Sequence, residues 1–418
     1  MRLLSFSVFF LLSSLAGRAQ DSLRLSRQQV DALFLKNNLV LLAERFRIDA
    51  SQAQVIQASL YDNPTVTLEL SAYNTARQRV LDVGRQGQKI VSVQQLLYTA
   101  GKRNKRIALA GEVAQLTQYE FTDLLRSLRF ELRSRFFDLY FQQQTLVRYE
   151  QQIATLQSTV TAFEQQYNRN NVSLRELLRL KALLFQLNND RLEIRLQQTE
   201  NQQTIQTLLS LEGPIIPLVE EAQLRQYQLP GVPADSLRER ALRHRADLLA
   251  SRSLSRQAEL NYNLQKALAV PDVRVGGTYD QAGSYISNYV GLSVSMDLPL
   301  LNRNQGAIKA ARSQIDYQQR LQQQKGIQVT NEVTAALQKV GEVERTVQSV
   351  EARFTDQFEQ LSQGVFTNFQ KGNLTLLEFI DFIETYNESA QQLNRLKAQR
   401  VSAYEELNYV VGEELFNP

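Results

Sequence analysis

The chain has 418 residues, 43% of them hydrophobic, which is enough for two or three ordinary domains or one elongated domain and excludes global disorder. It has no cysteine and one histidine, His244, so disulfide frameworks, thiolate or multi-histidine metal sites and a cysteine nucleophile are excluded, and a Ser-His-Asp triad is disfavoured. The 47 basic and 43 acidic residues nearly balance, so the composition lacks the excess of positive charge that is typical of a nucleic-acid-binding protein. We therefore expect no enzyme, no cofactor, no resident metal and no nucleic-acid partner.

Residues 1–20 have the pattern of a secretory signal peptide. Arg2 supplies the positive start, residues 3–15 form the apolar stretch, and Gly17-Arg18-Ala19 is a small-x-small cleavage site. The apolar stretch is shorter than the ~20 residues that span a bilayer, and no later segment reaches that length. The sequence therefore predicts an exported protein without a transmembrane helix.

The first structural unit is predicted at residues 21–213. Residues 26–60 are predicted to be helical, with Ser26 and Gln29 as a capping box. Strands are predicted at about 65–73 and 89–97, joined by a long polar loop into a hairpin. A helix at about 101–168 would be roughly 100 Å long at ~1.5 Å per residue, and a second helix follows at about 172–211.

The same order of elements then recurs at residues 234–418, after an irregular linker at 214–233 that contains four prolines. Leu-Leu-Ala at 41–43 recurs at 248–250, and Asn-Val-Ser-Leu at 171–174 is matched by Asn-Leu-Thr-Leu at 373–376. The predicted elements of this second unit are strands at about 272–281 and 288–298 and helices at about 304–368 and 374–410. Apolar residues spaced by three and four in both long helices, at 153–167 and 340–369, indicate coiled-coil seams. The chain therefore consists of two copies of one unit: helix, two strands, long helix, turn, helix.

The last predicted strand has one apolar face and one small or polar face. The apolar face is formed by Val290, Leu292, Val294, Met296 and Leu298. A core strand of a soluble sandwich has the same pattern, but a few strands between long helices cannot form a sandwich. Four strands also cannot close a barrel, for which about eight are the minimum. We therefore expect lipid to cover the apolar face, and three chains to supply twelve strands around a lumen lined by residues such as Gly276 and Thr278.

This pattern resembles the TolC-like outer-membrane efflux protein family over residues 25–412. The resemblance rests on the repeat, on the Asn63-Pro64 that opens the first strand, on the strand-to-helix joint LYTAGKR at 97–103, and on two helix-turn-helix tips. It implies a mainly α fold with a membrane β-barrel. The implied assembly is a homotrimer with a 12-stranded barrel in outer-membrane lipid, continuous with an α-helical periplasmic tunnel. It also implies docking to a periplasmic adaptor protein, which links the tunnel to an inner-membrane RND transporter.

The two tips are the first candidate sites. Asn170 and Gly372 tolerate the left-handed backbone that a helix reversal needs. The resemblance implies that these residues, with Val172 and Leu374, lie where the adaptor docks; alternatively, they only form turns. Family members often have a tyrosine three residues before the tip glycine, where this chain has Phe369.

The second candidate site is a constriction formed by Glu378 and Asp381, with Glu176 as the corresponding acid of the first unit. The spacing of three places Glu378 and Asp381 on one helix face, where a trimer would form two rings of carboxylates that attract cations. We expect mutual repulsion to raise their pKa values. The resemblance implies that such residues form the selective constriction, with Glu176 helping to hold the mouth closed. The alternative is a solvated acidic face.

These features predict an outer-membrane duct that exports its substrate passively. Two alternatives are left open. One is a soluble periplasmic coiled-coil adaptor, and the other is the outer-membrane duct of a type I protein secretion system. Shorter chains with this layout resemble the outer-membrane component of cobalt–zinc–cadmium efflux systems. Metal cations are therefore the first expected substrate, drugs the second and proteins the third.

Overall fold

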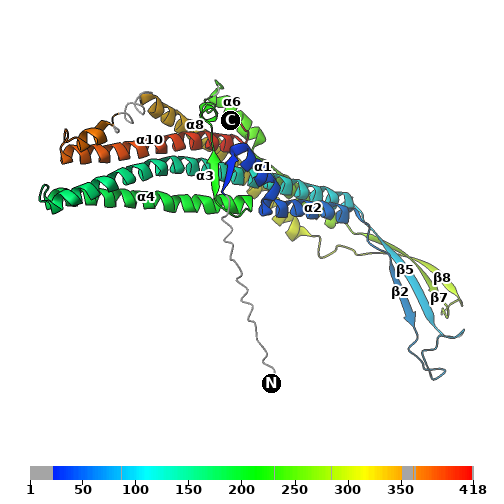
Figure 1. The fold of residues 1–418 in the computed structure, drawn as a ribbon. Helices are drawn as coiled ribbons and strands as arrows, with labels where there is room; N and C mark the ends of the chain where they lie inside the picture. Colours follow the sequence, from blue (N-terminus) through cyan, green and yellow to red (C-terminus); the bar gives the residue numbers. More distant parts are fainter. Residues whose placement is uncertain are drawn as a thin grey trace, which may run out of the picture.

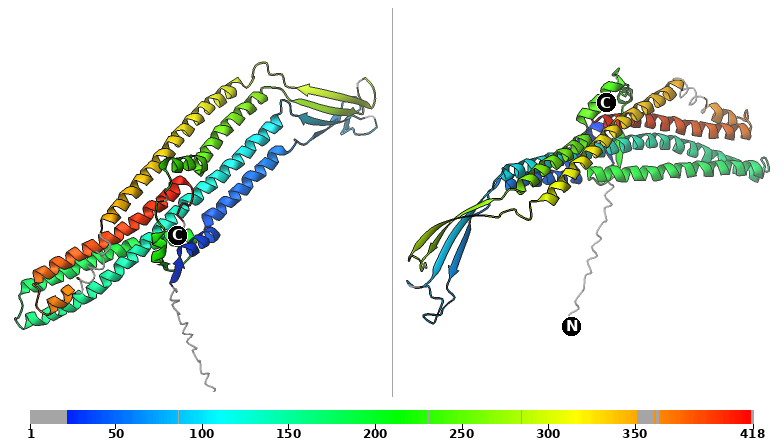
Figure 2. Two further views of the ribbon diagram at one scale, coloured as in Figure 1. Left: turned by 90° about the horizontal axis from the view of Figure 1, so that it is seen from above. Right: turned by 180° about the vertical axis from the view of Figure 1, so that it is seen from behind.

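The structure is a computed structural model that describes residues 22–85, 87–229, 231–283, 285–350, 361 and 364–416. The predicted signal peptide lies outside these residues. The molecule is elongated: long helices run side by side along most of its length, and a small sheet lies at one end (Figure 1, Figure 2). Within the described ranges, no helix combines the length and the hydropathy that crossing a membrane requires.

The two halves of the chain contain corresponding elements in the same order. The first half contains α1 (Arg27–Asn37), α2 (Leu39–Ser59), β2 (Thr65–Leu70), β5 (Lys89–Leu97), α3 (Lys102–Asn168) and α4 (Leu174–Leu209). The second half contains α6 (Ala234–His244), α7 (Ala246–Leu268), β7 (Val273–Asp280), β8 (Tyr289–Met296), α8 (Gln305–Ser349) and α10 (Leu376–Val411). With 67 residues, α3 is about 100 Å long at ~1.5 Å per residue.

The predicted helix at 26–60 is wrong in one respect, because it is two helices. Asn38, at φ −61° and ψ 112°, leaves the helical region between α1 and α2. Its side chain accepts from the Leu41 N–H at 2.9 Å and donates to the Leu208 carbonyl at 2.8 Å, so the break satisfies backbone groups on two helices. Arg245 separates α6 from α7 with nearly the same backbone, φ −63° and ψ 121°. Both side chains are buried at these breaks.

The linker predicted to be irregular, 214–233, contains regular structure. Its strand β6 (Ile215–Leu218) pairs in parallel with β1 (Leu23–Ser26), and a short helix α5 (Glu221–Arg225) follows. The prolines did not prevent pairing because Pro217 stands in a two-stranded sheet, where a missing donor is tolerated at an edge. These elements, α1, α6 and the C-terminal residues gather around the middle of the long helices (Figure 1). We call this region the belt.

The predicted helix at 304–368 is not continuous. α8 ends at Ser349, and Val350 has an extended backbone with φ −83° and ψ 113°. The β-branched Val343, Val347 and Val350 lower the helix propensity of this stretch. Residues 351–360 and 362–363 lie outside the described ranges, and so do Phe354 and Phe358 of the predicted seam. Helical backbone is present again at 364–370.

Of the predicted seam residues, Val340, Val365 and Phe369 are buried, whereas Leu361 is 52% exposed. In the seam of α3, Leu156 and Val160 are buried. The seams therefore pack along part of their predicted length.

Four strands form one antiparallel sheet in the order β2-β5-β7-β8, which leaves β2 and β8 as edges. The register aligns one apolar row formed by Val66, Val93, Gly277 and Leu292, and another formed by Leu68, Val91, Tyr279 and Val290. The opposite face carries the rows Thr65, Gln94, Gly276, Ser293 and Thr67, Ser92, Thr278, Gly291. The apolar face is uncovered in the single chain: Leu292 is 94% exposed and Val290 is 74% exposed. Strands of eight residues span about 26 Å, close to the ~25 Å apolar band of a membrane barrel.

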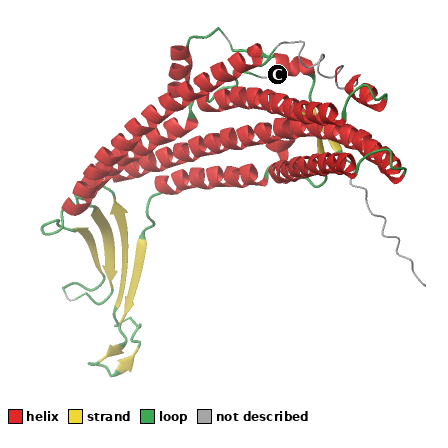
Figure 3. Cartoon of the chain, turned by 90° about the vertical axis from the view of Figure 1, so that its left-hand side faces the viewer, coloured by secondary structure: helices red, strands yellow, loops and turns green. Residues whose placement is uncertain are grey.

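The strand predicted at 65–73 ends earlier, at Leu70. The following residues form their own small hairpin of β3 (Tyr73–Asn74) and β4 (Arg79–Val80), beyond the end of the sheet (Figure 3). The amide of Asn74 donates to the buried carboxylate of Asp82 at 2.9 Å, which folds the loop back on itself. The loop predicted to be simply polar is therefore structured.

The joint between the sheet and the helices is fixed by polar contacts. Lys102, almost fully buried at the start of α3, forms an ion pair with Asp272 at 2.7 Å and donates to the Val270 carbonyl at 2.6 Å. Thr99 donates its backbone N–H to Asp272 at 2.9 Å and its hydroxyl to the Pro271 carbonyl at 2.6 Å. These contacts join the two halves of the chain where the strands meet the helices.

We predict that Gly276→Ala destabilises the sheet, whereas Gly277→Ala does not. A Cβ at Gly276 would lie 2.8 Å from the Val93 carbonyl oxygen and 2.9 Å from the Ser293 hydroxyl, whereas at Gly277 the nearest atom is 3.9 Å away. Overpacking of this kind costs about 1–3 kcal/mol. Urea unfolding of the two purified variants, followed by circular dichroism, measures the difference. Equal unfolding midpoints would contradict the close packing at Gly276.

Candidate functional site

The two helix tips have the same backbone geometry. Asn170 and Gly372 both adopt left-handed conformations, with φ 58° and φ 75°. The N–H of Asn171 donates to the Gln166 carbonyl at 2.9 Å. In the second tip, the N–H of Asn373 donates to the Asn368 carbonyl at 2.9 Å. Both bonds satisfy a carbonyl left free by the ending helix. Asn170 therefore adopts at the first tip the left-handed backbone conformation that Gly372 adopts at the second.

The helices that leave the tips begin with matching capping boxes. In α4 the backbone N–H of Ser173 donates to Glu176 at 2.8 Å, and the N–H of Glu176 donates to the Ser173 hydroxyl at 3.3 Å. In α10 the pair Thr375 and Glu378 has the same two distances. Each glutamate also accepts from the hydroxyl of its partner. Glu176 and Glu378 therefore stabilise the helix starts, a role that their spacing from Ser173 and Thr375 could have predicted.

Within the single chain the pKa of Glu378 is lowered, and the repulsion expected between copies of the chain stays a prediction. Hydrogen bonds from the Thr375 N–H and hydroxyl favour the ionised carboxylate and hold the pKa of Glu378 below its usual value. The corresponding bonds from Ser173 lower the pKa of Glu176. Both side chains are therefore charged at neutral pH.

Glu378 and Asp381 are both exposed, whereas Phe379 and Ile383, on the other side of α10, are buried. The acidic surface is longer than predicted, because Glu384 and Glu388 are exposed on the next two turns. The sequence carried a signal for these residues, since they follow Asp381 at spacings of three and seven. We call the exposed Glu378, Asp381, Glu384 and Glu388 the acidic face of α10.

Phe369, which replaces the tyrosine common in the family, forms part of an aromatic stack. Its ring lies 5.7 Å from Phe163 of α3 and 4.1 Å from Phe379 of α10, nearly parallel to both. Leu374 packs against the same apolar cluster, and Val172 is half-buried. The stack holds the second tip against the first hairpin.

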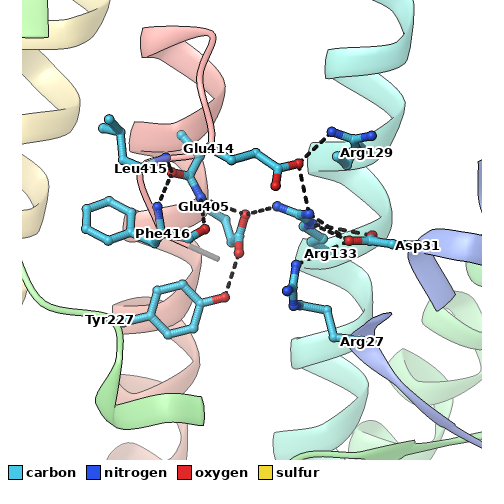
Figure 4. A network of polar contacts seen from close by, with 10 residues as sticks. Arg27, Asp31, Arg129, Arg133, Tyr227, Glu405, Glu414, Leu415 and Phe416 are labelled. Atoms are coloured by element: carbon cyan, nitrogen blue, oxygen red, sulfur yellow. Dashed lines mark hydrogen bonds and ion pairs between the residues drawn. The ribbon is translucent and has the colours of Figure 1, made fainter. Parts of the chain in front are cut away.

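A buried charge network at the belt was not anticipated from the sequence (Figure 4). The guanidinium of Arg133 pairs with Asp31 of α1 at 2.6 Å, with Glu405 of α10 at 3.3 Å and with Glu414 at 3.2 Å. The hydroxyl of Tyr227 donates to Glu405 at 2.5 Å. The network connects α1, α3, α10, the linker and the C-terminal residues. Its members are too far apart in sequence for spacing to have predicted it.

The pKa values within the network follow from its burial. Burial alone would lower the pKa of Arg133, but the hydrogen bond to Asp31 and the charges of Glu405 and Glu414 hold it above its usual value. Burial, with the adjacent Glu405 charge, raises the pKa of Tyr227. Arg133 therefore stays charged and Tyr227 stays neutral at physiological pH.

These elements define an elongated helical protein with a small sheet that is apolar on one face and polar on the other. Residues 32–210 and 237–413 match the family model described as "Outer membrane efflux protein". The chain belongs to this family.

Individual relatives agree with this assignment. The cobalt-zinc-cadmium resistance protein CzcC of Cupriavidus metallidurans is 21% identical over 386 residues, which cover 90% of this chain and 87% of CzcC. A crystal structure of CusC superposes with a TM-score of 0.74 at 15% identity, covering 93% of this chain and 92% of that chain. The Campylobacter jejuni CmeC outer membrane channel gives a TM-score of 0.75 at 13% identity, covering 92% and 85%.

The predicted family is confirmed, and so is the predicted location in the outer membrane with the helices in the periplasm. The family consists of channels and is not an enzyme family. The alternative of a soluble periplasmic adaptor is excluded by the family assignment. Within the described ranges, no group of three or more His, Cys, Asp or Glu side chains is arranged to hold a metal ion.

We predict that acid weakens the start of α10 through Glu378. Because folding lowers the pKa of Glu378, its carboxylate stabilises the helix start fully at pH values above the usual carboxyl pKa. This stabilisation is lost as the pH falls through the lowered pKa. Hydrogen–deuterium exchange of a peptide covering 375–380, corrected for intrinsic rates, should show less protection in acid. Glu378→Gln keeps the capping geometry without a titrating group, so its protection should not change with pH. The same acid-dependent loss in both proteins would contradict the assignment to Glu378.

We predict that Glu405→Ala destabilises the belt far more than Glu406→Ala. Loss of Glu405 leaves Arg133 and Tyr227 buried with fewer partners, which costs about 3 kcal/mol. Glu406 pairs with Lys339 at the surface, and such a pair contributes about 0–1 kcal/mol. Chemical unfolding of the two neighbouring variants gives the comparison. Equal losses of unfolding free energy in the two variants would contradict the energetic importance of the network.

Proposed function

We propose that three copies of this chain form a closed barrel and a continuous helical tunnel, the passive outer-membrane duct of a tripartite efflux system. The observation that carries the proposal is the four-stranded sheet, which has two free edges and an uncovered apolar face. About eight strands are the minimum for closure, and three copies supply twelve. In that assembly β8 of each copy pairs with β2 of the next. The apolar rows then face lipid, and the rows containing Gly276 and Thr278 face the lumen.

The helices support the same assembly. α4 buries one apolar stripe against its own chain but exposes a second stripe formed by Leu178, Phe185 and Leu192. These side chains are 54%, 69% and 54% exposed and lie seven residues apart, the spacing of a coiled-coil seam. A neighbouring copy would cover them.

We assign two roles to the tip region. Asn170, Val172, Gly372 and Leu374 would contact the periplasmic adaptor, which connects the duct to an inner-membrane RND transporter. The acidic face of α10 would line the tunnel mouth, where rings of Glu378 and Asp381 attract cations and repel anions. Glu176 would fix the first tip beside these rings and hold the mouth closed.

We propose metal cations as the first substrate class. The similarity to a cobalt-zinc-cadmium resistance protein and the acidic face support this choice over drugs and proteins. The duct would discriminate little by itself, because a wide polar lumen makes few specific contacts. Specificity would reside in the inner-membrane transporter.

Replacement of the acidic rings should reduce cation preference. In planar bilayers with a salt gradient, Glu378→Gln combined with Asp381→Asn should move the reversal potential toward zero, because the fixed negative charge is lost. Glu221→Gln with Asp235→Asn is the matched control, since both acids are exposed on the belt. An unchanged reversal potential for the tip variant would remove the assignment of the rings.

Deletion of the gene should sensitise the host to zinc, cobalt or cadmium, because export of the cation stops without an outer-membrane exit. Growth is measured across concentrations of each metal, with bile salts and dyes in parallel arms. Restoration by the plasmid-borne chain is the control. Sensitivity confined to bile salts and dyes would instead support drug export.

A further inference from the structure

The end of the sheet farthest from the helices carries two loops, described at 71–85 and 87–88 and at 281–283 and 285–288. The first loop contains the β3–β4 hairpin, which extends beyond the sheet (Figure 3). The side-chain amide of Gln281 donates to the Gly84 carbonyl at 2.7 Å and to the Gly87 carbonyl at 3.2 Å. The two loops therefore form one structured rim. With the helices in the periplasm, this rim lies on the outer side of the membrane.

The rim carries three arginines that pair with no carboxylate in the part of the chain that the structure describes. Arg77, Arg79 and Arg85 are exposed, and within the described residues none has a carboxylate oxygen within 4.0 Å. The one acid of these loops is Asp82, which is 6% exposed and turned inward to Asn74. Three arginines and one aspartate give the two loops a formal charge of +2.

Apolar side chains are exposed beside these arginines. Val80, next to Arg79, is 74% exposed, and Leu81 is 59% exposed. In the second loop, Tyr285 is 89% exposed and Ile286 is 55% exposed. A loop that contacts only water does not favour this composition, whereas cations beside apolar and aromatic groups are typical of a membrane interface.

We propose that the rim binds phosphate-bearing lipids of the outer leaflet, with Arg77, Arg79 and Arg85 on the phosphates and Val80 and Leu81 in the acyl boundary. Guanidinium groups pair with phosphate through two parallel hydrogen bonds, and each cation near an anionic surface adds to the affinity. Because no described carboxylate pairs with them, the three guanidinium groups are available to the lipid. This inference rests on the membrane placement of the sheet in the proposed function.

The test uses the full-length protein purified in detergent and titrated with lipid A, with dephosphorylated lipid A as the headgroup comparison. Native mass spectrometry counts the bound lipids. The triple variant Arg77→Gln, Arg79→Gln, Arg85→Gln should bind lipid A at least about tenfold more weakly. It should bind the dephosphorylated lipid as the wild type does. Val80→Ser should weaken binding of both lipids, because it removes the apolar contact.

The matched control carries the same charge change at the opposite end of the molecule, as Arg169→Gln, Arg175→Gln, Arg179→Gln. It should bind lipid A like the wild type. Equal binding by the rim variant and the wild type would overturn the inference, and so would equal weakening by the control. The same spectra give the number of chains in each particle. A trimer without lipid preference would reject this inference alone, whereas a monomer would reject the proposed duct.

Discussion

The structure depends on one constraint: each chain carries a sheet whose apolar face is covered by none of the residues that the structure describes. Elsewhere most of the buried apolar residues gather in two clusters, one at the belt and one near the tips. The sheet has no such core, and the side chains of Leu292 and Val290 are exposed on its apolar face. Burying this face contributes about 25 cal/mol per Å² only when another phase or another chain covers it. The proposed trimer in the outer membrane would satisfy that requirement, with lipid and neighbouring copies covering the face.

The long helices are fixed relative to one another by contacts at three places along their length. At the sheet end, the buried pair of Lys102 and Asp272 fixes the direction in which α3 leaves the strands. At the belt, Arg133 gathers carboxylates from three segments. At the tips, the aromatic stack around Phe369 joins the two hairpins. Each polar or aromatic junction fixes a register that a long apolar seam alone would leave free to slide.

The sequence predicted the parts that depend on local periodicity. Alternation along the strands and the left-handed residues Asn170 and Gly372 needed no knowledge of distant contacts. The break at Asn38 was missed because its amide finds its partner on Leu208, far along the chain. Similarly, β6 was missed because its pairing partner is at the N-terminal end. The hydrogen bonds that lower the pKa of Glu378 within one chain are local, and the spacing of Thr375 and Glu378 could have predicted them.

The central claim is that one chain cannot close its own pore, so the free edges of β2 and β8 must pair between copies. The most direct measurement is the mass of the particle after extraction and reconstitution into lipid nanodiscs. The account predicts particles of three chains, and none of one chain. A stable particle that holds a single chain in lipid would contradict it.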